Sequence, residues 1–495
     1  DQLEGRVEVG ADLDELRDRL LRGYRFILVD EYQDIDRRQY ALVSALAGRT
    51  AKEGDTKLSI MAVGDDDQNI YAFRKTSVGF IRRFTEDYHA EPVYLVENYR
   101  STQHIISAAN EIIAPAPGRM KIDHPIRIDH ARLRDPPGGR WETLDELARG
   151  QVQLFRVPGD RNLQAQLALR EIERLRALDG EADWSDFAVL GRTHETLEPI
   201  RAYCELHGIP YRTGERAGLS AIKTREGHAL LGALRRRSGR LIPVRALFRW
   251  IAAHARADPR NPWWEDLMAC AVDLDLAVGD VRVPALEAIE WFYGSAGARA
   301  REAPGHLNVL TAHGVKGREF KHVLVLDAGD WKGGGAEERR LLYVAMTRAK
   351  ETLSLFQSRD NPFLCALGDS EAVRTVEPKV LPLPSAALDR VHRELTPRDV
   401  DLGYAGRRAA EHPVHAAIAR LRVGDALDLV DRDLRDGAGR VVGRLAKGYA
   451  LPDRTVAGVK VSAIVVRKPQ GPEHQMRARP KVEEWETVLC DLTFE

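Results

Sequence analysis

The order of apolar and polar positions along the chain predicts strands that alternate with helices. Residues 11–22 place apolar side chains at helical spacing, and residues 26–31 (FILVDE) form a continuous apolar run that ends in acids. Such a run is typical of a buried strand in a parallel sheet. The alternation continues with a helix over 37–48, strands over 57–68 and 92–100, and a helix over 101–114. This part is predicted to be a doubly wound α/β domain with its site at the strand ends.

The alternation of strands and helices returns after residue 150. Strands over 307–314 and 322–329 resume it beyond a helical block, so that block is interpreted as an insertion. From residue 385 onward, short strands separated by turns predict a small β-rich module. The predicted organisation is a first RecA-like lobe, incomplete (1–113), a linker (114–150), the first part of a second RecA-like lobe (151–215), a helical insertion (216–303), the second part of that lobe (304–360), a linker (361–384) and the β-rich C-terminal module (385–495).

Composition and charge narrow the class of protein. The chain has 495 residues, of which 44% are hydrophobic, and 74 basic side chains balance 75 acidic ones. A nucleic-acid-binding protein with this balance needs a local basic groove. Four distant cysteines without a CxxC pair predict a reduced, cytoplasmic chain that has no structural zinc. No apolar run reaches the roughly 18 residues of a membrane helix, and the N-terminus does not resemble a signal peptide.

Asp30 and Glu31 end the first predicted strand, where carboxylates require a cation. An acid in this place can hold Mg²⁺ through its water shell, and a second acid can deprotonate an attacking water. This is the Walker B arrangement of P-loop nucleotide hydrolases. Taken alone, the pair fits a capped strand end with solvated acids at least as well.

Five motifs that occur in order along the chain favour the Walker B interpretation of Asp30 and Glu31 over a capped strand end. They are DEYQD (30–34), GDDDQNIYAFR (64–74), ENYRST (97–102), LTAHGVKGREF (310–320) and YVAMTRAK (343–350). In these motifs the sequence resembles the UvrD/Rep family of superfamily 1 DNA helicases, over residues 27 to 350. The resemblance implies a motor of two RecA-like lobes with ATP and Mg²⁺ between them. It also implies 3′ to 5′ movement on single-stranded DNA, with duplex/single-strand junctions as partners.

The resemblance assigns roles around the nucleotide. Asp30 would coordinate Mg²⁺, Glu31 would activate the water, and Gln68 would sense the γ-phosphate. Arg100 and Arg348 would contact the γ-phosphate from opposite lobes, because a planar guanidinium suits phosphate. The cofactor-binding residues would be Tyr99, stacked on adenine, Gly317, and Glu319 on the ribose hydroxyls. The alternatives are arginines in surface salt bridges, a glutamine at a strand end and a tyrosine in the core.

The resemblance also assigns residues to DNA. Tyr71 and Phe73 would offer stacking surfaces to bases, and Arg74 would supply the neighbouring cation. The alternative is that both rings are buried within the loop. Thr311 and His313 lie in the motif that links DNA to the nucleotide, and His313 fits a coupling residue as well as a direct contact.

The phosphate-binding motif GxxxxGK[ST] does not occur in these 495 residues. Two explanations follow: the chain is the C-terminal part of a longer helicase, or its line has lost hydrolysis. The first is favoured, because Glu31, Gln68, Arg100 and Arg348 are useful together only around a triphosphate. The competing function is a non-hydrolysing DNA-binding or scaffold protein. The C-terminal stretch also resembles bacterial proteins in which a RecQ-like region is fused to a UvrD-like one.

Overall fold

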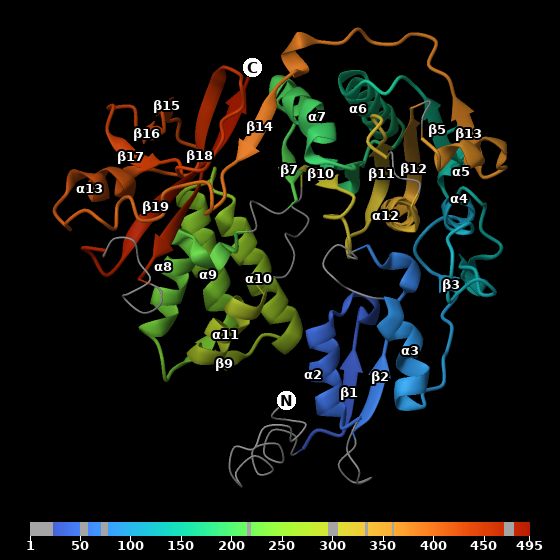
Figure 1. The fold of residues 1–495 in the computed structure, drawn as a ribbon, viewed down its shortest axis with the longest axis horizontal. Helices are drawn as coiled ribbons and strands as arrows, with labels where there is room; N and C mark the ends of the chain where they lie inside the picture. Colours follow the sequence, from blue (N-terminus) through green and yellow to red (C-terminus); the bar gives the residue numbers. More distant parts are fainter. Residues whose placement is uncertain are drawn as a thin grey trace. The chain divides into compact units, whose positions relative to one another are not determined.

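The computed structural model describes residues 23–49, 58–70, 78–214, 219–295, 305–331, 335–358, 361–469 and 480–495 (Figure 1). The chain forms two compact units, Asp1–Leu197 with Leu310–Leu383 and Glu198–Val309 with Pro384–Glu495. No helix in the described ranges is long and apolar enough to cross a bilayer. The predicted α/β class, with a parallel sheet and a small antiparallel module near the C-terminus, is confirmed.

A seven-stranded parallel sheet has the order β13-β5-β12-β11-β6-β10-β7. Its strands are β5 (Val152–Arg156), β6 (Phe187–Gly191), β7 (Tyr211–Thr213), β10 (Leu307–Thr311), β11 (Phe320–Leu326), β12 (Ala349–Gln357) and β13 (Val373–Val376). Three long helices connect them: α6 (Arg161–Leu178), α7 (His194–His207) and α12 (Ala336–Met346). Every residue of β6 is buried, as expected for a strand covered on both faces.

The N-terminal part of the first unit contains a parallel pair, β1 (Phe26–Val29) and β2 (Ser59–Ala62). Helices α2 (Arg37–Ala47) and α3 (Val78–Tyr88) contribute side chains that pack with Val29 and Ala62. The expectation that residues 26–29 are buried on both faces is wrong. Burial alternates along β1, and Phe26 and Leu28 are 69% and 75% exposed, because both helices cover the same face of the pair.

The third strand predicted over 92–100 is reduced to β3 (Glu97–Asn98). It pairs in parallel with β4 (Arg127–Ile128) in a separate sheet, so it adds nothing to the β1–β2 pair. The apolar run before it does not enter a sheet, and Val93 and Leu95 are 81% and 79% exposed. Two helices complete this part of the chain, α4 (Gln103–Ile113) and α5 (Trp141–Leu144).

The second unit joins helices and antiparallel strands around one hydrophobic core. Its helices are α8 (Arg225–Arg235), α9 (Val244–Ala257), α10 (Trp263–Val278), α11 (Ala285–Ser295) and α13 (Pro413–Arg420). Its antiparallel strands are β8 (Leu241–Pro243), β9 (Arg282–Pro284), β14 (Val391–Glu394), β15 (Asp428–Val430), β16 (Asp433–Arg435), β17 (Val441–Arg444), β18 (Val456–Arg467) and β19 (Trp485–Phe494). Trp263 of α10 donates from its indole nitrogen to Ser462 O of β18. Apolar side chains of both α10 and β18 belong to the same hydrophobic core.

Candidate nucleotide-binding site

The acids that follow β1 meet a lysine from a distant part of the chain. Lys316 Nζ lies 3.3 Å from Glu31 Oε2, and it donates hydrogen bonds to Asp34 and, at 3.1 Å, to the main-chain oxygen of Gln68. The lysine side chain is only 9% exposed. Burial raises the pKa of Asp34, and the hydrogen bond from Lys316 opposes that shift. Because a buried charge is costly without a partner, the lysine and the acids stabilise one another.

Asp30 and Glu31 themselves lie at the surface, in the turn that leaves β1. Glu31 has a left-handed backbone with φ of 52°, and its N–H donates to Asp30 Oδ1 at 2.8 Å. Gln33 Nε2 donates to Glu31 Oε2 at 2.5 Å and so orients that carboxylate. Carboxylate oxygens are the ligands that Mg²⁺ prefers, and the exposed Asp30 can offer them. The residues present therefore fit the ion that the sequence implies.

Gln68, Arg100 and Arg348 line one cavity of about 100 Å³. Arg348 Nη2 donates to Gln68 Oε1 at 3.3 Å, although the two residues are 280 positions apart in the sequence. Arg100 forms an ion pair with Glu319. The structure thus brings together three of the four residues expected to be catalytic, and Lys316 contacts the fourth, Glu31.

Arg348 has an unusual environment for a cation. The side chain follows α12, and the residue is 4% exposed. Its guanidinium donates to neutral acceptors, which are Val344 O, Arg318 O, Gln68 Oε1 and Thr347 Oγ1. Within the described ranges no carboxylate lies at ion-pair distance from it. Burial first, and then the charge of Arg100, lower the pKa of Arg348. The site therefore holds a buried positive charge that an anion would stabilise.

The residues expected to contact the base and the ribose are Tyr99, Gly317 and Glu319, and they lie wholly or partly at the surface. Tyr99 directly precedes Arg100, which lines the cavity. Tyr99 is 70% exposed, and its hydroxyl donates to Glu97 Oε2 at 3.2 Å. Glu319 accepts from Arg100 and from Lys350, whose Nζ lies 3.3 Å away. Gly317 has φ of 75°, a conformation that side chains with a Cβ rarely adopt.

The residues expected at DNA divide into two groups. Thr311 ends β10 and accepts a hydrogen bond from Gly314 N at 3.2 Å, and His313 lies half-buried in the turn that follows. This turn also carries Lys316, so the loop expected at DNA is continuous with the lysine that contacts Glu31. Tyr71, Phe73 and Arg74 lie outside the described residues.

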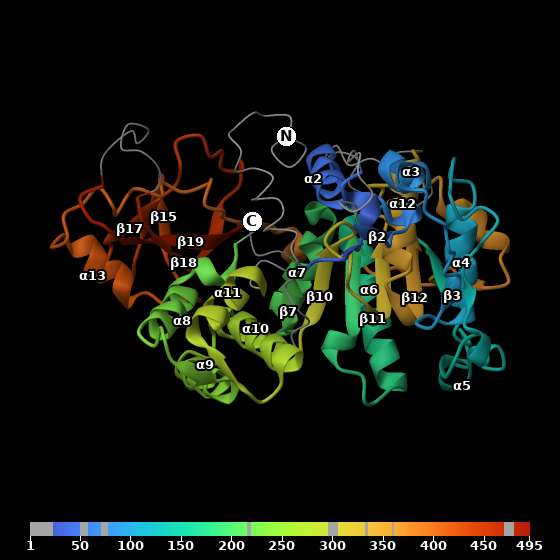
Figure 2. The same ribbon diagram turned by 90° about the horizontal axis from the view of Figure 1, so that it is seen from below.

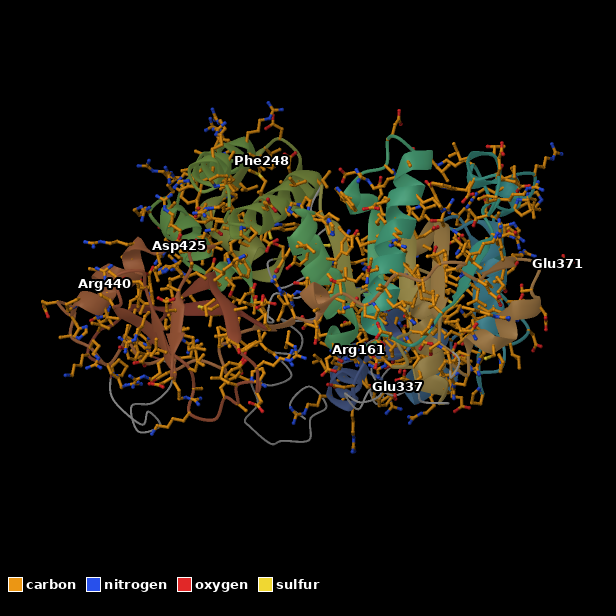
Figure 3. The ribbon with its side chains drawn as sticks, turned by 90° about the horizontal axis from the view of Figure 1, so that it is seen from above. Arg161, Phe248, Glu337, Glu371, Asp425 and Arg440 are labelled. Carbon is orange, nitrogen blue, oxygen red and sulfur yellow. The ribbon has the colours of Figure 1, made fainter. Side chains whose placement is uncertain are left out.

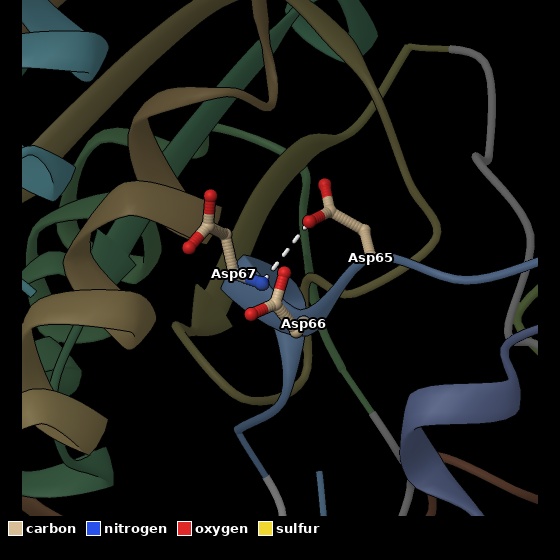
Figure 4. A group of neighbouring side chains, drawn as sticks. All are labelled: Asp65, Asp66 and Asp67. Atoms are coloured by element: carbon tan, nitrogen blue, oxygen red, sulfur yellow. Dashed lines mark hydrogen bonds between the residues drawn. The ribbon is translucent and has the colours of Figure 1, made fainter. Parts of the chain in front are cut away.

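Three consecutive acids follow β2, and their carboxylate oxygens lie within 4.8 Å of one another (Figure 4). Asp67 N donates to Asp65 Oδ1 at 3.0 Å, the contact drawn in that figure. Residues 119–121 already supply each acid with a hydrogen-bond donor or a cation. Arg119 donates to Asp67 through Nε and Nη2, and Met120 N donates to Asp66. Lys121 Nζ lies 2.7 Å from the carboxylate of Asp65. These acids hold residues 119–121 in place, and their charge does not require a metal ion.

Sequence reasoning identified the acids and arginines but missed the cations that contact the acids. Lys316 lies inside a quoted motif, and its position between His313 and Glu319 was the available signal. Arg119 and Lys121 lie in the stretch interpreted as a linker, where nothing local distinguishes them. Their roles depend on contacts across 52 and more positions of the chain.

Comparison with known proteins supports the family resemblance that the ordered motifs indicate. Residues 7–89 match the model of the UvrD/REP helicase N-terminal domain, and residues 93–220 and 306–356 match models of the UvrD-like helicase C-terminal domain. The ATP-dependent DNA helicase UvrD1 of Mycobacterium tuberculosis is 35% identical over 192 residues, which cover 39% of this chain and 22% of that protein.

Two further relatives match different shares of the chain. DNA helicase II of Escherichia coli is 48% identical over 95 residues, 19% of this chain and 12% of that protein. The putative ATP-dependent DNA helicase YjcD of Bacillus subtilis is 26% identical over 443 residues, 72% of this chain and 54% of that protein. The chain thus spans about half or less of the length of these relatives. Motifs, family models and relatives agree that the chain belongs to the UvrD/Rep family of superfamily 1 helicases.

Proposed function

We propose that this chain is the part of an ATP-dependent DNA helicase and single-stranded DNA translocase that supplies the catalytic acid, the phosphate-contacting arginines and the DNA loop. Movement is 3′ to 5′, and the protein acts at duplex/single-strand junctions in DNA repair or recombination. The observation that carries the proposal is the buried guanidinium of Arg348, which has neutral partners and lines one cavity with Gln68 and Arg100. A phosphate group is the anion that such a pair of arginines suits.

The roles follow from the chemistry of each side chain. Asp30 would hold Mg²⁺, which lowers the charge of the phosphates when bound. Glu31 accepts a proton from the attacking water, and Gln33 keeps its carboxylate oriented. Arg100 and Arg348 neutralise the charge that develops on the γ-phosphate, an effect worth roughly 10³–10⁵ in rate for an arginine finger. Gln68, bonded to Arg348, reports the state of the phosphate to that arginine.

Lys316 suggests how DNA and hydrolysis are coupled. Its Nζ contacts Glu31 and Asp34, and the same turn follows Thr311 and His313. A shift of this turn on single-stranded DNA would move the positive charge relative to the catalytic acid. The lysine then acts as a positioning residue for Glu31.

A hydrolysis assay tests the proposal. The 495 residues alone lack GxxxxGK[ST], so we expect no DNA-stimulated ATP hydrolysis from them. A polypeptide extended by the natural upstream reading frame should hydrolyse ATP, and Glu31→Gln in that polypeptide should abolish turnover. Turnover by the 495 residues that disappears in Glu31→Gln would contradict the expected inactivity. No turnover by the extended polypeptide would favour the alternative, a non-hydrolysing DNA-binding scaffold.

A further inference from the structure

Four polar side chains lie in a row across neighbouring strands of the seven-stranded sheet. Arg156 of β5 is paired with Gln357 of β12 in the register of the sheet. Glu377 directly follows β13 and Asp327 directly follows β11, each one residue beyond the last register pair of its strand. Because side chains alternate between the two faces of a strand, these four project from the same face. In the strand order β13-β5-β12-β11, the row therefore presents an acid, a base, an amide and an acid.

This row lines a cavity of about 1030 Å³ at the carboxyl ends of the four strands. All of its lining residues belong to the first compact unit, and none of them lines the cavity of Gln68, Arg100 and Arg348. A cavity with apolar walls and a few polar groups is the usual form of a small-molecule site. The large apolar side chains in its wall are Val157, Pro158, Trp331, Pro378 and Leu381.

The connections beside this cavity leave the sheet in opposite directions. After β5 the chain enters α6 and reaches β6, on one side of β5 in the strand order. After β12 it passes through the short helix Leu364–Asp369 and reaches β13, on the other side. Arg161 and Glu337, labelled in Figure 3, lie in the first turns of α6 and α12 and mark this edge of the sheet. Helix α12 packs on β11 and β12, and Figure 2 shows these elements from below. Parallel α/β sheets bind ligands in the crevice at such a reversal of direction.

Gln357 carries an acceptor that the protein leaves unsatisfied. The residue is 7% exposed, and its Nε2 donates to Cys365 Sγ at 3.3 Å. Its Oε1 accepts no hydrogen bond from any residue that the structure describes. The neighbouring Asp327 accepts from Ser358 N at 2.7 Å, and burial raises the pKa of this carboxyl group. A ligand with N–H donors and a positive charge would satisfy the amide oxygen and stabilise the ionised form of Asp327.

Arg156 supplies the opposite charge in the same row. Its Nη1 lies 3.9 Å from Glu377 Oε1, and the two side chains are 50% and 74% exposed, so this pair contributes little. Gly368 leaves room for the guanidinium, because a Cβ at that glycine would lie 2.8 Å from Arg156 Nη2. A planar guanidinium is well suited to a carboxylate. The cavity therefore offers a site for a negative group beside a site for a positive one.

We propose that this cavity binds a small zwitterion with an apolar side chain, which is an α-amino acid or a short peptide. Its carboxylate would contact Arg156, and its ammonium would contact Gln357 Oε1 beside Asp327. Adjacent strands are about 4.8 Å apart, so the Cα atoms of Arg156 and Asp327 are separated by about 10 Å, enough to hold both groups between the side chains. The charged lining residues are two acids and one base, which disfavours a nucleotide because its phosphate would meet like charge.

The site uses none of the residues that the proposed helicase function requires, so the two proposals fail separately. Saturation-transfer NMR on the 495-residue chain can measure binding of L-leucine and of L-alanyl-L-leucine. We expect at least one probe to bind with a Kd on the order of 1 mM or below. A preference for leucine identifies a free amino acid as the ligand, and a preference for the dipeptide identifies a peptide. N-acetyl-L-leucine lacks the ammonium and L-leucinamide lacks the carboxylate, so both should bind more weakly than leucine.

The protein variants test the same contacts from the other side. Arg156→Gln should weaken binding by roughly 10- to 100-fold, the usual effect of a lost hydrogen bond to a charged group, and Gln357→Met by roughly 3- to 10-fold. Arg156 is half exposed, so the thermal unfolding midpoint of Arg156→Gln should not change. Arg170→Gln is the matched control, because Arg170 is an exposed arginine of α6 that does not line the cavity.

Three results would overturn the proposal. The first is that neither leucine nor the dipeptide binds the folded chain. The second is an equal loss of binding in Arg156→Gln and Arg170→Gln, because net charge alone would then explain it. The third is Arg156-dependent binding of adenosine monophosphate without binding of either zwitterion, which would make the cavity a nucleotide site. A loss that is selective for Arg156→Gln and for the capped probes would support the site even if the extended polypeptide does not hydrolyse ATP.

Discussion

His392 of β14 provides a quantitative test of the packing in the second unit. Its Nδ1 lies 2.6 Å from Glu198 Oε2 and its Nε2 lies 3.3 Å from Glu205 Oε1, both on α7. The His392 main-chain N–H also donates to Glu198 at 2.8 Å. Tyr211 of β7 donates to Glu205 at 2.9 Å. The other charged groups that face this cluster are Arg201, Arg393, Lys460 and Asp491.

Burial alone would lower the pKa of His392, but the hydrogen bonds to Glu198 and Glu205 raise it above its ordinary value. Burial alone would raise the pKa of Glu205, but His392 lowers it to about 2. The histidine contribution is fully present below the unfolded pKa of about 6.5, and it is lost as pH rises through the raised folded value. The glutamate contribution is present above about 4.5 and lost as pH falls toward 2. Stability of this unit should therefore be highest between about pH 4.5 and 6.5.

The magnitude follows from the depth of burial. The His392 side chain is 2% exposed, and removing one partner of a buried ion pair costs about 3–5 kcal/mol. The shift of Glu205 alone corresponds to about 3 kcal/mol, and both values describe the same contact and are counted once. We therefore expect His392→Leu to lower the free energy of unfolding of this unit by about 3 kcal/mol at pH 5.5, and by less at pH 8.5.

Urea unfolding followed by tryptophan fluorescence measures this effect, because five of the eight tryptophans lie in the second unit. His228→Leu is the matched control, since His228 faces Glu484 at 3.6 Å in a more exposed pair and should cost less than about 1 kcal/mol. Equal midpoints for the wild type and His392→Leu at pH 5.5 would refute the reasoning. A wild-type unit that is more stable at pH 8.5 than at pH 5.5 would show that the sign is wrong.

Two further predictions concern the first unit. Lys316→Met should lower the free energy of local unfolding of the segment 23–49 by roughly 1.5–3 kcal/mol, because Asp34 loses a charged hydrogen bond. Amide hydrogen exchange in this segment should then be faster than in the wild type. Lys350→Met, at an exposed lysine, is the control. Unchanged exchange in Lys316→Met would contradict the importance of this contact. Arg119→Ala should cost about 3–5 kcal/mol in urea unfolding, because Asp67 is fully buried, whereas Arg127→Ala at an exposed pair should cost at most about 1 kcal/mol. If Arg119→Ala/Asp67→Asn does not recover stability relative to Arg119→Ala, an uncompensated carboxylate is not the cause.

The pattern of apolar and polar positions predicted much of the first unit, because the periods of strands and helices depend on residues that are close in the sequence. The buried strands β5, β6 and β11 appear as apolar runs, and the parallel sheet followed from their alternation with helices. The strand β12, which lies between β5 and β11, was not predicted. The same reasoning failed for residues 92–100, where an apolar run that looks like a strand leaves Val93 and Leu95 exposed. An apolar run of this type is typical of a strand, but whether it is buried in a sheet depends on neighbouring segments that belong to other parts of the chain.

The sequence by itself determined the chemistry of the candidate site. Acids, glutamine and arginines occur in a fixed order, and the identity of each side chain limits what it can bind. Tertiary structure alone decided which groups meet. Lys316 reaches Asp34 across 282 positions, Arg119 reaches Asp67 across 52, and the helical block shares its core with the C-terminal strands. The physical reason is that charge pairing and burial depend on distance in space, which residue order fixes only through the folded chain.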